Sequence, residues 1–168
     1  MKLDITNLLN GIEKSISVDY TLNLDDLSYG TYYPIKDGAK VCGKVYGKAN
    51  VVYLEAEVSF KFSGFCDRCA EDVNRDMGFS LNKIVVSELA NEDDDKEDYI
   101  IVQDAVLDID EIVREEVQLF LPSKILCRED CKGLCFKCGK NLNLGDCGCK
   151  KEVDPRMAAL LELLDDEE

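Results

Sequence analysis

The chain has 168 residues, 46% hydrophobic and 33% charged, which is enough for one domain with a sizeable core and a small appendage, but not for two cores. Its 20 Lys and Arg against 35 Asp and Glu give a net charge of −15, which excludes nucleic-acid binding over the whole surface and restricts any such contact to local patches. Nine cysteines and no histidine exclude Ser-His-Asp triads, Cys-His nucleophiles and H-E-x-x-H metalloproteases.

The sequence also predicts the compartment. No stretch approaches the roughly 18–20 apolar residues that a transmembrane helix needs. The first residues carry Asp4 where a secretory peptide would have its apolar run. We therefore expect a cytoplasmic protein without membrane contact, in which clustered cysteines are metal ligands or redox thiols and not disulfides.

Strand patterns dominate the first half of the chain. Short strands are expected over 15–22 and near 32–35. Residues 40–46 and a strand starting at Val51 predict a hairpin with its turn at 47–50. In the second of these strands every other residue is apolar, which is typical of a half-buried antiparallel strand: Val52, Leu54, Ala56, Val58, Phe60 and Phe62. A third strand over about 77–87 follows a tight turn at 66–69, so we expect an antiparallel and possibly barrel-like sheet.

The second half of the chain predicts helices. The acidic run 91–98 is interpreted as a solvated loop, because it lacks the Gly and the ligand spacing of a calcium loop. Helical periodicity spans about 108–121, with Asp108 as N-cap and Pro122 as the stop. A short last helix is expected from Asp154 and Pro155 to Leu164, followed by an acidic tail that frays.

Together these elements predict an α+β fold in three parts. A β-rich domain would occupy residues 1–126, a Cys-rich metal-binding segment 127–152, and the short helix with its tail 153–168.

Eight of the nine cysteines form four closely spaced pairs, and the ninth, Cys42, is interpreted as a packing residue. Zinc takes four ligands in a tetrahedron, so four pairs predict one or two structural zinc ions. The candidate ligands are Cys66, Cys69, Cys127, Cys131, Cys135, Cys138, Cys147 and Cys149. Local spacing favours one site made of the last four, a zinc knuckle or ribbon, and a second site that joins the strand turn to the segment after the helix. Free thiols at the Cys66 or Cys127 pair, or an iron–sulfur cluster in place of zinc, are the alternatives.

Neither set of cysteines predicts catalysis. Four thiolates on each ion leave no open position for a reactive water. A redox role for Cys66 and Cys69 requires a helix N-terminus to lower a thiol pKa, whereas this pair lies between two strands. We therefore expect no enzymatic activity and no small-molecule substrate.

Two groups of lysines are candidate contacts for nucleic acid or a protein partner. Lys40, Lys44 and Lys48 share one face of an extended strand, and Lys137 and Lys140 lie in the Cys-rich segment. Two zinc ions with four thiolates each would carry −2 apiece and move the chain from −15 to about −19. The alternative for these lysines is that they only neutralise the thiolates and keep the segment soluble.

The Cys66-Asp67-Arg68-Cys69 turn, the helix end at Leu119-Phe120-Leu121-Pro122, the run from Cys127 to Asn143 and the closing Asp154-Pro155-Arg156 resemble the YceD family. These are bacterial and plastid proteins named for large ribosomal RNA accumulation. The resemblance covers about residues 36–164, although many members have Pro where this chain has Phe136. It implies a role in the synthesis, processing or stability of large-subunit (23S) ribosomal RNA, and it supplies no catalytic activity.

The favoured hypothesis is therefore a non-enzymatic ribosome-biogenesis factor that binds a ribosomal protein, large-subunit rRNA or both. The negative charge favours a basic ribosomal protein as the direct partner. A zinc-stabilised protein-interaction module unrelated to ribosomes and a dithiol redox protein are the alternatives.

Overall fold

The computed structural model of the chain describes residues 1–48, 51–86, 99–102 and 104–149. The expected last helix from Asp154, the acidic run 91–98 and part of the expected turn at 47–50 lie outside the described residues.

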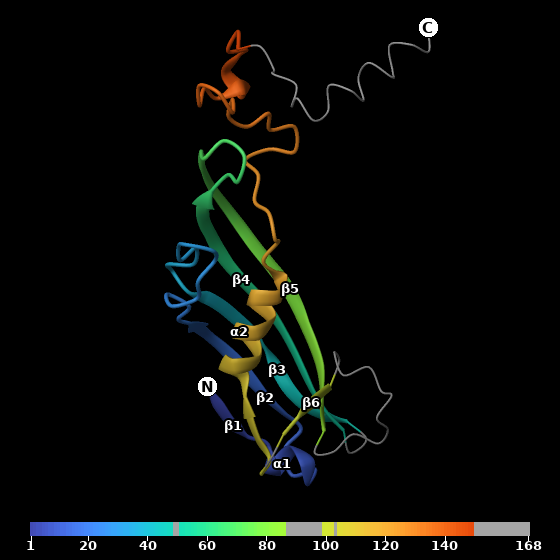
Figure 1. The fold of residues 1–168 in the computed structure, drawn as a ribbon. Helices are drawn as coiled ribbons and strands as arrows, with labels where there is room; N and C mark the ends of the chain where they lie inside the picture. The colour runs from blue at the N-terminus through green and yellow to red at the C-terminus, as the bar shows by residue number, and fades with distance from the viewer. Residues whose placement is uncertain (49–50, 87–98, 103, 150–168) are drawn as a thin grey trace, which may run out of the picture.

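The main sheet has five strands in the order β2-β3-β4-β5-β6 (Figure 1). Their bounds are β2 Ser15–Leu22, β3 Ala39–Lys48, β4 Val51–Phe65, β5 Asp72–Val86 and β6 Tyr99–Ile101. The pairings from β2 to β5 are antiparallel, but β6 runs parallel to the end of β5. The prediction of a purely antiparallel, possibly barrel-like sheet is therefore wrong: the sheet is mixed, and within the described residues it does not close.

The remaining elements are short. A separate two-stranded sheet pairs β1 Lys2–Asp4 with β7 Val106–Asp108, and α1 spans Thr6–Leu9. The strand expected near 32–35 is absent from the described chain, where Tyr29 and Tyr32 form only an isolated bridge. The third expected strand starts earlier than predicted and becomes the fifteen-residue β5. Its first residues alternate poorly, and they extend as a strand because they pair with the end of β4.

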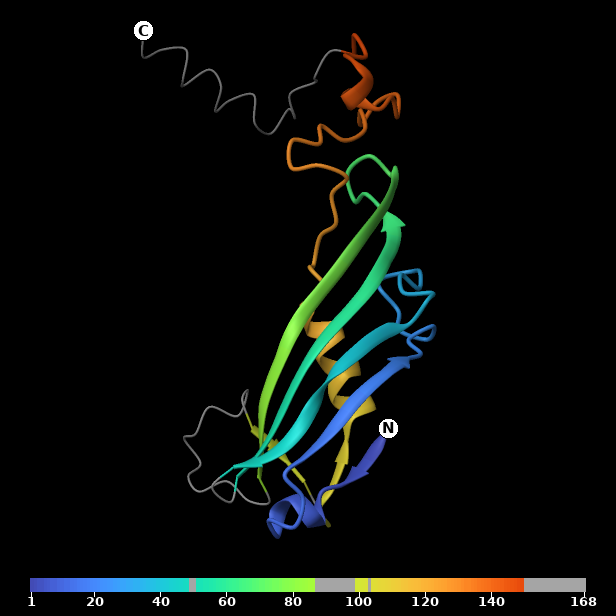
Figure 2. The ribbon, with the colours of Figure 1, turned by 180° about the vertical axis from the view of Figure 1, so that it is seen from behind.

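Helix α2, Ile109–Phe120, lies across one face of the sheet, and the opposite face is open in the view from behind (Figures 1 and 2). Its buried residues Ile109, Val113 and Val117 pack against the apolar face of the sheet. Asp108 occupies the N-cap position without a side-chain cap hydrogen bond, and its carboxylate instead lies 3.5 Å from the Lys2 ammonium. The extended Leu121 ends the helix because the residue before a proline disfavours helical dihedrals.

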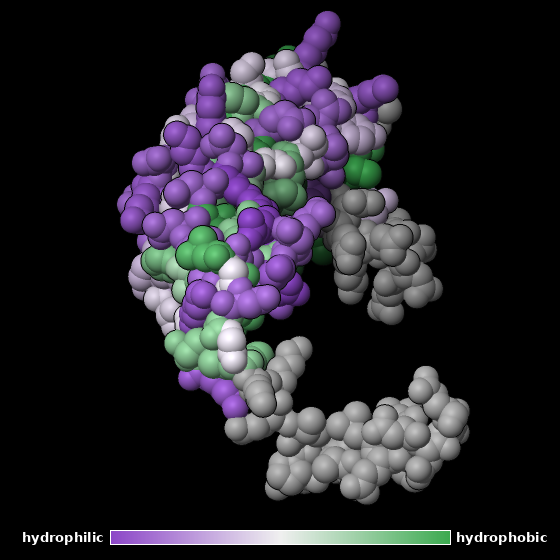
Figure 3. All heavy atoms as spheres, turned by 90° about the horizontal axis from the view of Figure 1, so that it is seen from above, coloured by the Kyte–Doolittle hydropathy of each residue, from purple (hydrophilic) through white to green (hydrophobic). Residues whose placement is uncertain are grey.

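The core follows the period of two that the sequence showed for β4. Its inward residues from Val52 to Phe62 are all at most 5% exposed, so that prediction is confirmed. A second apolar cluster surrounds the tip of the β4–β5 hairpin and contains three of the cysteines: Phe62, Cys66, Cys69, Val73, Ile125 and Cys131. Viewed from above, hydrophilic side chains cover much of the surface, with smaller apolar patches between them (Figure 3). None of the helices in the described part of the chain has the length and apolar character that crossing a membrane requires.

Candidate metal centres

The β4–β5 hairpin tip presents the first two thiols. β4 ends at Phe65, and the next four residues form a turn in which the Ala70 amide donates to the Cys66 carbonyl at 2.9 Å. The Cys66 amide donates to the Glu71 carbonyl at 2.8 Å, and Ala70 adopts a positive φ of 58°. This tight turn brings Cys66 and Cys69 to the same side of the hairpin.

The segment after α2 delivers the next two thiols. Asp67 holds it from both sides, because the Asp67 amide donates to the Ile125 carbonyl at 2.8 Å and the Ile125 amide donates to the Asp67 carboxylate at 2.5 Å. Arg75 donates to the Leu126 carbonyl at 2.5 Å, and Arg68 donates to the Cys131 carbonyl at 2.8 Å. Hairpin-tip residues thus fix where the chain passes, although they lie far from it in sequence.

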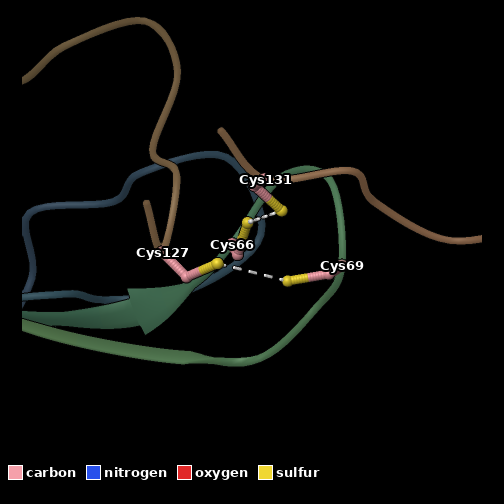
Figure 4. Close-up of side chains that lie close together, drawn as sticks. All are labelled: Cys66, Cys69, Cys127 and Cys131. Carbon is pink, nitrogen blue, oxygen red and sulfur yellow. Dashed lines mark hydrogen bonds between the residues drawn. The ribbon is translucent and has the colours of Figure 1, made fainter. Parts of the chain in front are cut away.

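The four thiols meet there in what we call cluster A (Figure 4). Its sulfur atoms lie within 4.8 Å of one another, with 3.7 Å between Cys66 and Cys131 and 3.5 Å between Cys69 and Cys127. A tetrahedral zinc with bonds of about 2.3 Å separates its sulfur ligands by about 3.8 Å, whereas a disulfide requires about 2.05 Å. The spacing therefore fits a four-thiolate metal site, and all nine cysteines are free of disulfides.

The surroundings of cluster A favour thiolates at some positions and thiols at others. Burial alone would raise the pKa of Cys66, but hydrogen bonds from the amides of Cys127, Arg68 and Cys69 lower it to about 6. The Glu71 amide favours the Cys69 thiolate, yet burial and hydrogen bonds with the neighbouring thiols raise the Cys69 pKa to about 12. Without a metal ion, Cys66 therefore loses its proton more readily than Cys69. A cation that binds four thiolates displaces the protons that remain.

Cluster B contains the other four cysteines, Cys135, Cys138, Cys147 and Cys149, whose sulfur atoms also lie within 4.8 Å of one another. A knuckle positions the first pair: the Gly139 amide donates to the Cys135 carbonyl at 2.9 Å, and Gly139 takes a φ of 70° that suits glycine. Hydrogen bonds from the Cys138 and Lys137 amides lower the pKa of Cys135 to about 6. Hydrogen bonds with Cys138 and Cys147 raise the pKa of Cys149 to about 12.

The two clusters differ in burial. In cluster A, Cys66, Cys69 and Cys131 are buried and Cys127 is half-buried. In cluster B, by contrast, two of the cysteines are exposed and two half-buried. Cluster A therefore belongs to the folded core, whereas cluster B is a surface feature. The grouping is the one that local spacing favoured, while metal ligation by these eight residues stays a prediction.

Two asparagines connect the clusters, and the sequence interpretation gave them no role. Asn143 donates to the Cys131 sulfur at 3.4 Å, which lowers the pKa of Cys131, and it accepts from the Lys132 amide at 2.8 Å. Asn141 donates to the Glu71 carboxylate at 2.8 Å. Their only sequence signal is their place between the two pairs of cluster B, in a turn-rich segment.

The candidate lysines are placed as follows. Lys40, Lys44 and Lys48 lie on the same, open face of β3, as predicted, and all three are exposed. Lys44 forms a salt bridge with Glu55, at 3.2 Å, and a cation–π contact with Tyr46, whose ring centroid lies 4.7 Å from the Lys44 ammonium.

The two lysines of the Cys-rich segment lie beside cluster B. Lys140 donates to the Asp146 carbonyl at 2.7 Å, and Lys137 is part of the Cys135–Cys138 knuckle. Contact of any of the five lysines with RNA or protein stays a prediction.

Comparison with known proteins gives a family and three informative relatives. The family described as "Large ribosomal RNA subunit accumulation protein YceD" matches residues 54–164. The uncharacterised protein YlbN of Bacillus subtilis is 31% identical over 175 residues, which cover 99% of each chain. The uncharacterised protein Rv2926c of Mycobacterium tuberculosis is 32% identical over 115 residues, 67% of this chain and 56% of that protein. The chloroplastic "Large ribosomal RNA subunit accumulation protein YCED homolog 1" of Arabidopsis thaliana is 27% identical over 148 residues, 71% of this chain and 46% of that protein. No solved structure matches the chain.

Proposed function

The chain belongs to the YceD family of large ribosomal RNA subunit accumulation proteins, and from this premise we propose that it supports the accumulation of 23S rRNA as a non-enzymatic factor in ribosome biogenesis. The proposal places it in the cytoplasm, where ribosomal subunits assemble.

The single observation that carries the non-enzymatic part is the pair of four-cysteine clusters. A zinc ion held by four thiolates has no open position for water or substrate, and the chain has no histidine to act as a general base near it. The clusters therefore suit structural zinc. Cluster A would hold the hairpin tip to the segment that follows α2, and cluster B would stabilise the exposed Cys-rich segment.

The charge supports a basic ribosomal protein as the direct partner. A chain of net charge −15 repels phosphates over most of its surface, and each zinc site with four thiolates adds further negative charge. Lys44 also shares its charge with Glu55, which weakens the lysine stripe on β3 as a phosphate contact. Contact with rRNA is then confined to Lys40 and Lys48 on this face and to the lysines of cluster B.

The test is a deletion strain complemented by plasmid-borne variants. Loss of the gene should lower 23S rRNA relative to 16S rRNA and deplete mature large subunits in sucrose gradients, and the wild-type chain should restore both. Normal large subunits in the deletion strain would refute the proposal and favour an interaction module unrelated to ribosomes. Rapid cycling of the cluster thiols between disulfide and reduced forms would instead favour a redox protein.

A further inference from the structure

β5 pairs with β4 along one edge, whereas most of its other edge has no partner strand in the described part of the chain. β4 pairs with β5 from Asp72 to Val85, whereas β6 pairs only with Ile84, Val85 and Val86. At the other end, the Arg75 side chain donates a hydrogen bond to the Leu126 carbonyl and so holds the chain after α2 close to the start of β5. Between these limits, residues 76–83 pair with no other strand in the described part of the chain. A strand of this length, about 26 Å, offers its backbone groups to an added strand.

A groove with one apolar wall lies beside this edge, between β6 and α2. The cavity has a volume of about 500 Å³, and its apolar wall is made by Tyr99, Ile100, Ile101, Ile112 and Leu119. Two of these side chains are largely in solvent, since Leu119 is 79% exposed and Ile101 54%. Phe79 and Phe120, whose ring centroids are 4.9 Å apart, continue the apolar surface along the edge. A strand added to β5 would place every second side chain against this wall.

The charged residues that line the groove sum to a negative charge. Among the described residues that line it, Lys83 is the one base beside two acids, Glu115 and Glu116, and its ammonium lies 2.7 Å from the Glu116 carboxylate. Inward-facing lysines protect many natural edge strands, but the pairing with Glu116 neutralises this one. The sequence between residues 66 and 126 holds 17 acidic and 6 basic residues, and six of the acids directly precede β6, between 92 and 98. Charge complementarity therefore selects a basic partner.

We propose that the outer edge of β5 accepts an extended, basic segment of a ribosomal protein as an added strand, with its apolar side chains in the groove against α2. This inference rests on the proposed function and names where and how the partner binds. A second copy of the chain fits poorly, because pairing two edges would bring two acidic surfaces of like charge together. An RNA strand fits poorly as well, since the described residues that line the groove include two carboxylates, which repel phosphates.

The binding test uses the full-length, zinc-loaded protein and synthetic peptides that tile the large-subunit ribosomal proteins of the same organism. At least one basic peptide should bind in fluorescence polarisation, and hydrogen exchange of the amides in residues 76–83 should slow when it does. The same peptide with alternate backbone amides N-methylated should lose binding, because an added strand needs those donors. Leu119→Lys should weaken binding by about tenfold or more, because it puts a cation where an apolar side chain of a basic partner would pack.

The matched control is Leu144→Lys, because Leu144 is also 79% exposed but lies near cluster B. This variant should bind like the wild type, and both variants should keep the wild-type melting temperature. The inference is overturned if no peptide binds, if both variants lose binding equally, or if binding slows exchange elsewhere than in residues 76–83. If amide exchange in residues 76–83 slows as the protein concentration rises, in the absence of peptide, the edge instead pairs with a second copy of the chain.

Complementation separates this inference from the proposed function. If Leu119→Lys restores 23S rRNA as well as the wild type does, the docking edge is wrong while the proposed function stands. If the deletion strain has normal large subunits, the proposed function fails, whatever the peptides do.

Discussion

Cluster A should contribute far more to the stability of the sheet than cluster B, and paired substitutions measure the difference. Replacing Cys127 and Cys131 with Ser leaves only the two hairpin thiols, which cannot link distant parts of the chain. Replacing Cys147 and Cys149 with Ser is the matched change in cluster B. Both double variants keep the first pair of their cluster.

The magnitude follows from the loop that each metal ion closes. Cys69 and Cys127 are 58 residues apart. A crosslink that closes a loop of this length lowers the entropy of the unfolded chain and thereby raises its free energy by about 4 kcal/mol at 25 °C. For a chain of this size the loss corresponds to a fall in melting temperature of about 8–16 °C. Cluster B closes only a short loop outside the sheet, so its loss should disorder the Cys-rich segment and leave the unfolding of the sheet within about 1 kcal/mol of the wild type.

Urea unfolding of the zinc-loaded proteins, followed by far-ultraviolet circular dichroism of the sheet, measures both effects. The wild-type protein treated with a chelator provides a second route to the same comparison without a substitution. Equal destabilisation by the two double variants, or a loss below about 1 kcal/mol in the cluster A variant, would refute the assignment of cluster A as the crosslink of the fold.

Three further measurements test the site and the core. Elemental analysis should find two zinc ions for each chain, and the purified protein should be colourless; a brown protein would indicate iron–sulfur clusters. In the metal-free protein at pH 7, iodoacetamide should modify Cys135 before Cys66, because Cys135 is half-buried near the surface whereas Cys66 is buried in the core; faster modification of Cys66 would contradict the buried placement of cluster A. Phe62→Ala should lower the free energy of unfolding by about 3–5 kcal/mol, because its ring is fully buried and packs edge-on against Tyr29, whereas Phe65→Ala, at a ring 51% exposed, should cost less than about 1 kcal/mol.

Strong local patterns made the centre of the fold predictable. The alternation in β4 is long and regular, so it specified both the strand and its buried face. The apolar stripe of α2 and the proline after it gave nearly the correct helix. The division of the cysteines into two sets followed from short spacings, because nearby ligands need little chain entropy to meet.

The sequence failed where tertiary pairing decides the conformation. The three residues of β6 show no alternation, and they form a strand because they pair with the end of β5, so neither the strand nor its parallel direction was predictable. Near residues 32–35 the aromatic residues suggested a strand, but Tyr32 packs edge-on against Tyr29 and Phe62 in a folded-back loop. The bridging role of Asn143 depends on a contact with Cys131 that is visible only after the two clusters have met.

A short segment of chain joins cluster A to α2, which forms part of the proposed docking groove, so the cluster should affect binding at that groove. The chain leaves α2 at Leu121, is held at Ile125 by Asp67, and enters cluster A at Cys127. The last turn of α2 carries Leu119, a wall of the groove, so cluster A fixes the end of the helix that faces the β5 edge. We expect the cluster A double variant to bind the basic peptide more weakly even at temperatures where its sheet remains folded.

The cluster B double variant, by contrast, should bind that peptide as the wild type does, because none of its substitutions lies between α2 and the edge. Equal binding by all three proteins would show that the groove keeps its shape without the metal crosslink. Loss of binding in the cluster B variant alone would indicate that the peptide binds to the Cys-rich segment and not to the edge of β5.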